Sequence, residues 1–422
     1  MDKLFFLDLF AGAGGLSEGF IRAGFTPIAH LEQDKAACNT LLTRMAYHWL
    51  KNTGLHNIYI EYLLGEKNRE EFYGIIPDQI KDSIINLEIN DQTLQTAFNK
   101  VQNLLTAKNI SVDVIVGGPP CQGFSLVGRS RNEKGMTDDK RNYLYKFYAK
   151  FLRQYQPKCF VFENVIGLLS AKDLDGKLHI EKMKKEFNNS GYDVAVKALN
   201  MSEFGIPQTR KRVIIFGSLK ELNLQFPELE KETVNGMVAD LINQLPSLKA
   251  GEGYPKTILE DNSNTYLEQL KIKSPGIPIT LHSARPNNKR DLEIYKITAE
   301  KWNKNKERLN YSDLPENLKT HKNKEDFTDR YKVVAADIPY SHTILAHLAK
   351  DGHFFIHPDI DQNRSITPRE AARLQTFPDD YYFESLSEKP SRSAVFKQIG
   401  NAVPPLFAEK LAIKIKDLVN GK

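Results

Sequence analysis

Cysteine is scarce in this chain. Only three cysteines occur among 422 residues, at positions 38, 121 and 159, and no two of them form a Cys-x-x-Cys pair. Three scattered cysteines exclude a disulfide framework, and the missing pair removes the usual sequence mark of a zinc site. We therefore expect no structural metal, and at least one thiol is free to do chemistry.

Long apolar runs are missing as well. No stretch approaches the roughly 18 consecutive apolar residues that a membrane-spanning helix needs. The first ten residues, MDKLFFLDLF, are interrupted by Asp8 and lack the length and cleavage site of a secretory leader. These observations predict a cytoplasmic protein without a membrane partner.

The chain also lacks a strong bias in charge or composition. A net charge of +5 permits a nucleic-acid partner without requiring one. With 41% hydrophobic and 26% charged residues, neither a disordered nor a fibrous class fits. Since single hydrophobic cores stop growing at about 250–300 residues, the length predicts two domains.

The first half of the chain alternates short apolar runs with amphipathic stretches. The runs are rich in β-branched and aromatic residues, which predicts buried strands at 3–10, 112–118, 158–165, 192–199 and 212–219. Helical periodicity predicts helices at 16–25, 35–50, 92–109, 143–156 and 177–187. This alternation predicts an α/β fold with a mostly parallel sheet. The last two strands are joined without a helix, so one antiparallel strand is expected.

Beyond residue 222 this rhythm disappears, which indicates a second, smaller domain. Within it, residues 285–308 carry eight Lys or Arg against four Asp or Glu, with Tyr295 and Trp302 among them. Such a segment suits a surface that faces phosphates. A solvated helix face explains the charge pattern equally well.

A glycine-rich turn follows the first predicted strand. In LDLFAGAGGLSEGF, Ser17 stands where the dinucleotide fingerprint G-x-G-x-x-G requires its third glycine, which argues against NAD. Glu32 lies twenty residues after Gly12, at the end of a predicted second strand, where its carboxylate can accept hydrogen bonds from ribose hydroxyls. Tight packing alone can also explain such a turn, but turn and acid together favour an adenosine-bearing cofactor.

Cys121 differs from the other two cysteines. It follows the strand at 112–118 in VDVIVGGPPCQGFS, so it is expected at the carboxyl edge of the sheet, where open α/β sheets bind ligands. Two prolines restrict the backbone ahead of it and donate no hydrogen bonds. Cys38 and Cys159 lie within a predicted helix and a predicted strand and fit the ordinary role of small buried side chains.

Six blocks occur in the order DLFAGAGG, PPCQGFS, ENV, QTRKR, RSITPREAARLQTFPD and QIGNAVPP along this sequence. Together they resemble the blocks of the DNA (cytosine-5)-methyltransferases of restriction–modification systems. They span residues 8–217 and 364–412 and leave mainly 41–110 and 222–363 unmatched. The resemblance implies a Rossmann-like sheet that binds S-adenosyl-L-methionine, formed by residues 1–222 and 397–422, and a target-recognition domain at 223–396.

The resemblance also implies the reaction and the residues that perform it. The enzyme would flip a specific cytosine out of double-stranded DNA and methylate C5 through a covalent bond between Cys121 and C6. Glu163 would act at N3, Arg212 would contact O2, and Arg210, expected on the same face, would support the catalytic loop or a phosphate. A capping carboxylate and an edge-strand arginine are the structural alternatives for Glu163 and Arg212.

Further residues are assigned to the cofactor and to the substrate. The expected cofactor-binding residues are Phe10, Gly12, Gly14, Gly15, Glu32, Gln33, Asp82, Pro119, Asn401 and Ala402. Asp91 is the alternative to Asp82, because the long 41–110 segment departs from the family's spacing. The expected substrate-binding residues are Gln122, Ser125, Arg129, Arg131, Arg141, Asn164 and Gln208.

The partners follow from the same resemblance. Double-stranded DNA is the expected substrate, a cognate restriction endonuclease would act separately, and we expect a monomer. An RNA cytosine-5 methyltransferase of the tRNA type shares these motifs and is the alternative, although its shorter variable region argues for DNA here. The recognised DNA sequence and the base that removes the C5 proton cannot be identified from the sequence.

Overall fold

A seven-stranded sheet forms the centre of the first half of the chain. The computed structural model describes residues 3–120, 140–258, 264–321 and 328–421. The sheet has the order β3-β2-β1-β4-β5-β8-β6. Its strands are β1 (Phe5–Leu9), β2 (Thr26–Glu32), β3 (Ile84–Asn86), β4 (Val114–Gly117), β5 (Cys159–Val165), β6 (Tyr192–Asn200) and β8 (Lys211–Leu219).

The pairing of the strands confirms the predicted class. Neighbouring strands from β3 to β5 run parallel, whereas β8 is antiparallel to both β5 and β6. The five strands predicted from apolar runs form, the second strand expected to end at Glu32 forms as β2, and β6 and β8 are joined without an α-helix. The carboxyl ends of β1, β2, β4 and β5 therefore meet at one edge, as expected for a ligand site.

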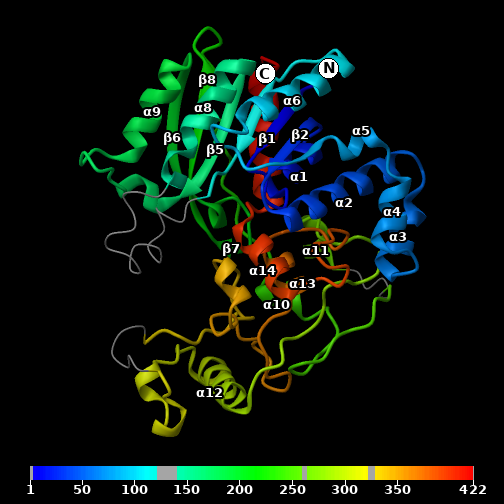
Figure 1. The fold of residues 1–422 in the computed structure, drawn as a ribbon. Helices are drawn as coiled ribbons and strands as arrows, with labels where there is room; N and C mark the ends of the chain where they lie inside the picture. The colour runs from blue at the N-terminus through cyan, green and yellow to red at the C-terminus, as the bar shows by residue number, and fades with distance from the viewer. Residues whose placement is uncertain (1–2, 121–139, 259–263, 322–327, 422) are drawn as a thin grey trace.

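Helices cover both faces of the sheet because adjacent strand residues point in opposite directions. Phe6 packs in one apolar cluster with Phe20 and Phe407, while its neighbour Leu7 packs in a second cluster with Tyr148 and Phe187. The first cluster includes residues of α1 (Gly15–Arg22) and α15 (Pro405–Val419), and the second includes residues of α6 (Leu94–Lys108), α8 (Leu144–Tyr155) and α9 (His179–Asn189). Figure 1 shows this layering.

The segment between α2 (Lys35–Asn52) and β3 contains structure that the sequence patterns did not predict. It forms α3 (His56–Leu64), α4 (Arg69–Ile75) and α5 (Asp78–Lys81). Tyr59, Tyr62 and Phe72 of this segment form an aromatic cluster with Tyr382. The unmatched 41–110 segment thus packs against the C-terminal quarter of the chain.

Residues after 222 contain few regular elements. Apart from α15, the α-helices and strands described after residue 222 are α10 (Val238–Ile242), α11 (Thr265–Gln269), α12 (Lys289–Asn305), α13 (Pro368–Leu374), α14 (Arg392–Asn401) and the short strand β9 (Ser341–His342), which pairs with β7 (Gln208–Thr209). Leu241 and Tyr266 share the apolar cluster of α1 and α15, whereas α12 belongs to a cluster of its own. Figure 1 shows α12 at the end of the molecule opposite the sheet. The boundaries at 222 and 396 stay a prediction.

The basic segment 285–308 includes α12. Tyr295 is buried against Tyr331, and Trp302 donates a hydrogen bond through Nε1 to Asp337. Its aromatic residues therefore have partners within the protein. Within the described ranges, no helix combines the length and hydropathy that crossing a membrane requires.

Candidate active site

A large cavity opens at the carboxyl edge of the sheet. Its volume is about 1980 Å³. One wall carries residues from the ends of β1, β2, β4 and β5, and the opposite wall includes His321, Arg330, His347, His353 and Phe354. Such an edge is where open α/β sheets bind ligands.

The glycine turn forms one end of this cavity. Phe10, Gly12 and Gly14 have φ angles of 58°, 55° and 78°, so the backbone turns sharply after β1. The amide of Gly12 donates to Glu32 Oε2 over 2.8 Å, and the amide of Asp34 donates to Glu32 Oε1 over 2.7 Å. The Glu32 carboxylate is therefore fixed in orientation at the cavity wall. Burial raises its pKa.

Asp8 lies at the floor of the same end. It is 1% exposed, lines the cavity, and neither carboxylate oxygen has a hydrogen-bond partner within the described part of the chain. Burial, followed by the nearby charge of Glu32, raises its pKa well above the ordinary value. A buried carboxyl without a partner is costly. The site therefore fits a ligand that brings a positive charge or a donor to this floor.

The C-terminal segment closes this end of the cavity. A Cβ atom on Gly15 would lie 2.2 Å from the carbonyl oxygen of Val403, so only glycine allows α1 to pack this closely. Asn401 and Ala402 line the cavity as a result. Gln33 and Pro119 line it too, whereas Gly14 does not.

The structure separates the two acids considered for the adenine. Asp82 is exposed at the end of α5 and lies outside the cavity lining. Asp91 lines the cavity and forms an ion pair with Lys150, with 2.9 Å between Nζ and Oδ1. Of these two acids only Asp91 borders the cavity, and the choice between them stays a prediction.

A pair of opposite charges forms the other end of the cavity. Arg212 Nε lies 2.8 Å from Glu163 Oε1, and both side chains are largely buried and line the cavity. A Cβ on Gly118 would lie 3.0 Å from Glu163 Oε2, so the glycine leaves room for this carboxylate. Asn164 donates through Nδ2 to the carbonyl of Pro119, over 3.4 Å, and thereby links the end of β5 to the segment that follows β4.

Arg210 and Gln208 do not lie where the sequence predicted them. Arg210 is fully buried, is not among the cavity-lining residues, and donates to the carbonyls of Ile344, Gly400 and Ala402. Gln208 is also fully buried and donates through Nε2 to Leu374. Residue 210 lies between β7 and β8, so the alternation of a continuous strand does not hold there. Both side chains connect the sheet to the C-terminal part of the chain.

Five of the predicted catalytic and substrate-binding residues belong to the segment 121–139. Cys121, Gln122, Ser125, Arg129 and Arg131 lie outside the described residues. Pro120, which directly precedes Cys121, lines the cavity, and Arg141 lines it as well.

Sequence reasoning missed part of the lining. Asp8 belongs to the quoted DLFAGAGG block, and its position as a carboxylate inside a buried strand was the signal. Asn86 at the end of β3 and the loop that follows it, residues 87–92, also line the cavity, and of these only Asp91 was considered from the sequence. That loop lacks a recognisable motif, because β3 is only three residues long.

Comparisons with known proteins identify relatives over the whole chain. A family model described as C-5 cytosine-specific DNA methylase matches residues 4–58 and 68–417. The type II methyltransferase M.Bpa9945I of Bacillus paralicheniformis is 40% identical, over 98% of this chain and 99% of that protein. The type II methyltransferase M1.HphI of Haemophilus parahaemolyticus is 30% identical, over 97% of this chain and 86% of that protein.

Solved structures resemble the fold. A crystal structure described as a DNA modification methyltransferase encoded within an E. coli prophage has a TM-score of 0.61 and 23% identity, over 99% of this chain and all of that one. The methyltransferase EhMeth of Entamoeba histolytica has a TM-score of 0.54 and 13% identity, over 100% of this chain and 99% of that one. At these identities the likeness concerns the fold alone.

Proposed function

Because the chain belongs to the family of C-5 cytosine-specific DNA methylases, we propose that it methylates C5 of a specific cytosine in double-stranded DNA through a covalent bond between Cys121 and C6. The observation that carries this proposal is the Glu163–Arg212 pair, which lines the same cavity as Glu32 and the glycine turn. An acid and a cation next to a cofactor-sized space are what cytosine methylation requires.

S-adenosyl-L-methionine is the proposed cofactor. When bound, it would supply a methyl group from its sulfonium centre and leave as the thioether S-adenosylhomocysteine. Asp8 and Glu32 suit it chemically, because its ammonium group and ribose hydroxyls are hydrogen-bond donors. Phe10, Gly12, Gly15, Gln33, Pro119, Asn401 and Ala402 would complete its site, with Asp91 at the adenine. The unpartnered carboxyl of Asp8 supports this assignment.

The chemical steps follow from the reactivity of cytosine. The Cys121 thiolate bonds to C6, and the electrons of the C5–C6 double bond move to C5, with negative charge spreading to N3 and O2. Glu163 holds a proton at N3, and Arg212 stabilises the charge at O2. C5 then accepts the methyl group, loses its proton to a base, and the C6–S bond breaks as the double bond re-forms.

The target base must leave the helix to react, because C5 and C6 are stacked within a duplex. Arg141 and the cations Arg129 and Arg131 would grip the DNA backbone around it, and Gln122, Ser125 and Asn164 would surround the flipped base. Residues 223–396 would read the sequence. With about six phosphate contacts, the logarithm of the DNA-binding constant should fall linearly with the logarithm of the salt concentration, with a slope of roughly −5.

The test combines mapping with covalent trapping. Plasmid DNA incubated with the protein and S-adenosylmethionine should gain bisulfite-resistant cytosines in one sequence context. DNA with 5-fluorocytosine at that position should then form a complex stable to denaturing electrophoresis, because C5 has no proton to lose. Cys121→Ser should abolish both results. Methylation of tRNA instead of DNA, or a methyl group on adenine or on N4, would overturn the proposal.

The biological context is that of a modification enzyme. The similar proteins from Bacillus paralicheniformis and Haemophilus parahaemolyticus are named type II methyltransferases. By analogy, the methylated site would be protected from a separate restriction endonuclease of the same specificity. Cleavage of unmodified but not of modified plasmid by an extract of the source organism would support this pairing.

A further inference from the structure

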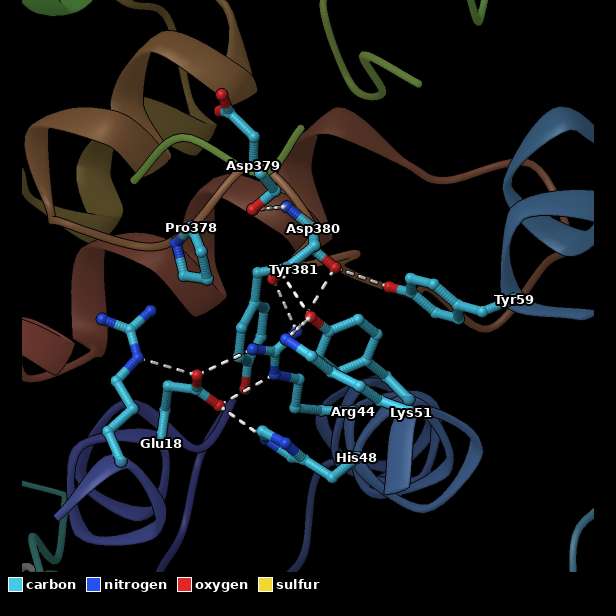
Figure 2. Close-up of polar contacts among 12 residues, drawn as sticks. Glu18, Arg44, His48, Lys51, Tyr59, Pro378, Asp379, Asp380 and Tyr381 are labelled. Atoms are coloured by element: carbon cyan, nitrogen blue, oxygen red, sulfur yellow. Dashed lines mark hydrogen bonds and ion pairs between the residues drawn. The ribbon is translucent and has the colours of Figure 1, made fainter. Parts of the chain in front are cut away.

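A buried charge network joins three segments beside the glycine turn. Arg44 of α2 contacts Glu18 of α1, with 2.7 Å between Nη2 and Oε1, and Asp380, with 2.7 Å between Nη1 and Oδ1. All three residues are at least 90% buried. Figure 2 shows Arg44 between the two acids, with His48 also in contact with the Glu18 carboxylate.

The network holds fixed charges. Burial alone would raise the pKa of Glu18, but the charges of Arg44 and His48 outweigh it and hold that pKa well below the ordinary value. Burial would likewise raise the pKa of Asp380, but the charge of Arg44 outweighs burial and lowers that pKa. A paired and fully hydrogen-bonded buried network is costly to rearrange, so it fixes the segment 378–381 relative to α1 and α2.

Tyr381 extends from this segment to the glycine turn. Its ring lies under the guanidinium of Arg44, 4.7 Å from the ring centre to Cζ. Its hydroxyl donates to the carbonyl of Ala13 over 2.5 Å. A Cβ on Gly14 would lie 3.0 Å from that hydroxyl, so the glycine at this position makes room for the contact.

The backbone of Tyr381 is held from the other side. Arg369 of α13 donates through Nη2 to the carbonyl of Tyr381, over 2.9 Å, and through Nε to the carbonyl of Thr280, over 3.0 Å. The tyrosine is therefore fixed between the region after residue 222 and the turn that begins α1.

We propose that Tyr381 is a positioning residue for cofactor binding, which holds the turn at Ala13 in its binding conformation through its hydroxyl. The inference rests on the proposed use of S-adenosylmethionine. Tyr381 is far from the glycine turn in the sequence and does not line the cavity. The inference is that it nevertheless affects the affinity for the cofactor. Without the hydroxyl, the carbonyl of Ala13 loses a buried donor, and part of the binding free energy is spent on ordering the turn.

The test compares two tyrosines that make the same kind of bond. Tyr192 of β6 is also fully buried, and its hydroxyl donates to the backbone carbonyl of Pro157 over 2.8 Å, but it lies in the second apolar cluster, which contains no residue of the segment 378–381. Tyr381→Phe and Tyr192→Phe each remove one oxygen atom and keep the ring. Each variant is titrated with S-adenosylhomocysteine in a calorimeter, and its thermal unfolding is recorded.

Tyr381→Phe should weaken binding of S-adenosylhomocysteine about fivefold or more, as expected for a typical net hydrogen-bond energy, while Tyr192→Phe stays within about twofold of the wild type. The KM for S-adenosylmethionine should rise with Tyr381→Phe while the KM for DNA does not change. Equal affinity in Tyr381→Phe and wild type, or equal weakening in both variants, overturns the inference. A wild-type protein that binds no S-adenosylhomocysteine instead overturns the proposed cofactor.

Discussion

Arg212 Nε and Glu163 Oε1 lie 2.8 Å apart because their strands are antiparallel neighbours. Glu163 pairs with Ile214 in the sheet register, and Arg212 is two residues along β8 from that partner. Residues in such a diagonal arrangement point to the same face of a sheet, within reach of long side chains. The single antiparallel strand thus brings the arginine to the acid.

Replacing the acid of this pair tests its role in the reaction. Glu163→Gln keeps the size of the side chain but cannot supply a proton to N3 in the same way, and we expect methyl transfer to slow by roughly 10²- to 10⁴-fold. Tritium transfer to plasmid DNA measures the rate. Glu186→Gln is the matched control, because Glu186 pairs with Arg153 on the surface of α9. A rate for Glu163→Gln equal to that of the control would contradict the role.

The choice between Asp82 and Asp91 has a direct test. Of the two, Asp91 lines the cavity and Asp82 does not, so Asp91→Asn should raise the KM for S-adenosylmethionine about fivefold, as loss of one hydrogen bond of about 1 kcal/mol would. Asp82→Asn should leave the KM unchanged. Initial rates at saturating DNA and varied cofactor decide the matter, and the reverse pattern would restore Asp82.

The sequence predicted the regular part of the fold better than its connections. The five strands predicted from apolar runs were recognisable because those runs are short and rich in β-branched and aromatic residues. By contrast, β3 has only three residues, and α5 has four, so neither carries a readable period. The helices α3 and α4 pack through an aromatic cluster with Tyr382. Because Tyr382 is far away in the sequence, the local pattern of residues does not reveal this contact.

The site was predictable where chemistry determines the residue type. Glu32 and Glu163 lie at the cavity as the motifs indicated, because strands that end at one edge bring their last residues together. Arg210 was misplaced because a motif gives the residue but not the direction of its side chain. The break between β7 and β8 that turns Arg210 into the interior depends on pairing with β9, more than 130 residues later.

Arg210 should therefore matter for stability. Arg210→Met leaves the carbonyls of Ile344, Gly400 and Ala402 without this donor, and we expect a loss on the order of 3 kcal/mol in the free energy of unfolding. Thermal unfolding should shift down by several degrees. Arg153→Met on the surface should change stability by no more than about 0.5 kcal/mol. A similar small change for Arg210→Met would show that the buried contacts contribute little.

Glu370 makes stability depend on pH. Burial would raise the pKa of this carboxyl, but the paired Arg364 outweighs it and lowers the pKa to about 2. A carboxyl with a depressed pKa in the folded state stabilises the protein above its unfolded pKa, near 4.5, and loses this contribution as the pH falls toward 2. The contribution at pH 7 is on the order of a few kcal/mol.

Glu370→Gln should remove this dependence. Urea midpoints of wild type and variant should differ most at pH 7, and the difference should shrink as the pH falls below about 4.5, since Glu370 of the unfolded wild type then takes up a proton while the folded state stays ionised. A difference that stays constant between pH 7 and pH 3 would mean that the Arg364 pair does not carry the effect.

Two glycines test how closely the cavity wall is packed. In Gly15→Ala the new methyl group would meet the carbonyl oxygen of Val403 at 2.2 Å, and because that atom is backbone, the segment at 402–403 must move. We expect a loss of about 1–3 kcal/mol in stability together with weaker binding of S-adenosylhomocysteine, because Gly15, Ala402 and Val403 all line the cavity.

In α4, a Cβ on Gly74 would meet nothing within 4 Å. Gly74→Ala should therefore stabilise the protein, by about 0.5–1 kcal/mol, and leave cofactor binding unchanged. Calorimetry and urea unfolding of both variants measure the two effects. If Gly15→Ala bound S-adenosylhomocysteine as tightly as Gly74→Ala, the segment at 402–403 would be able to move without weakening the site.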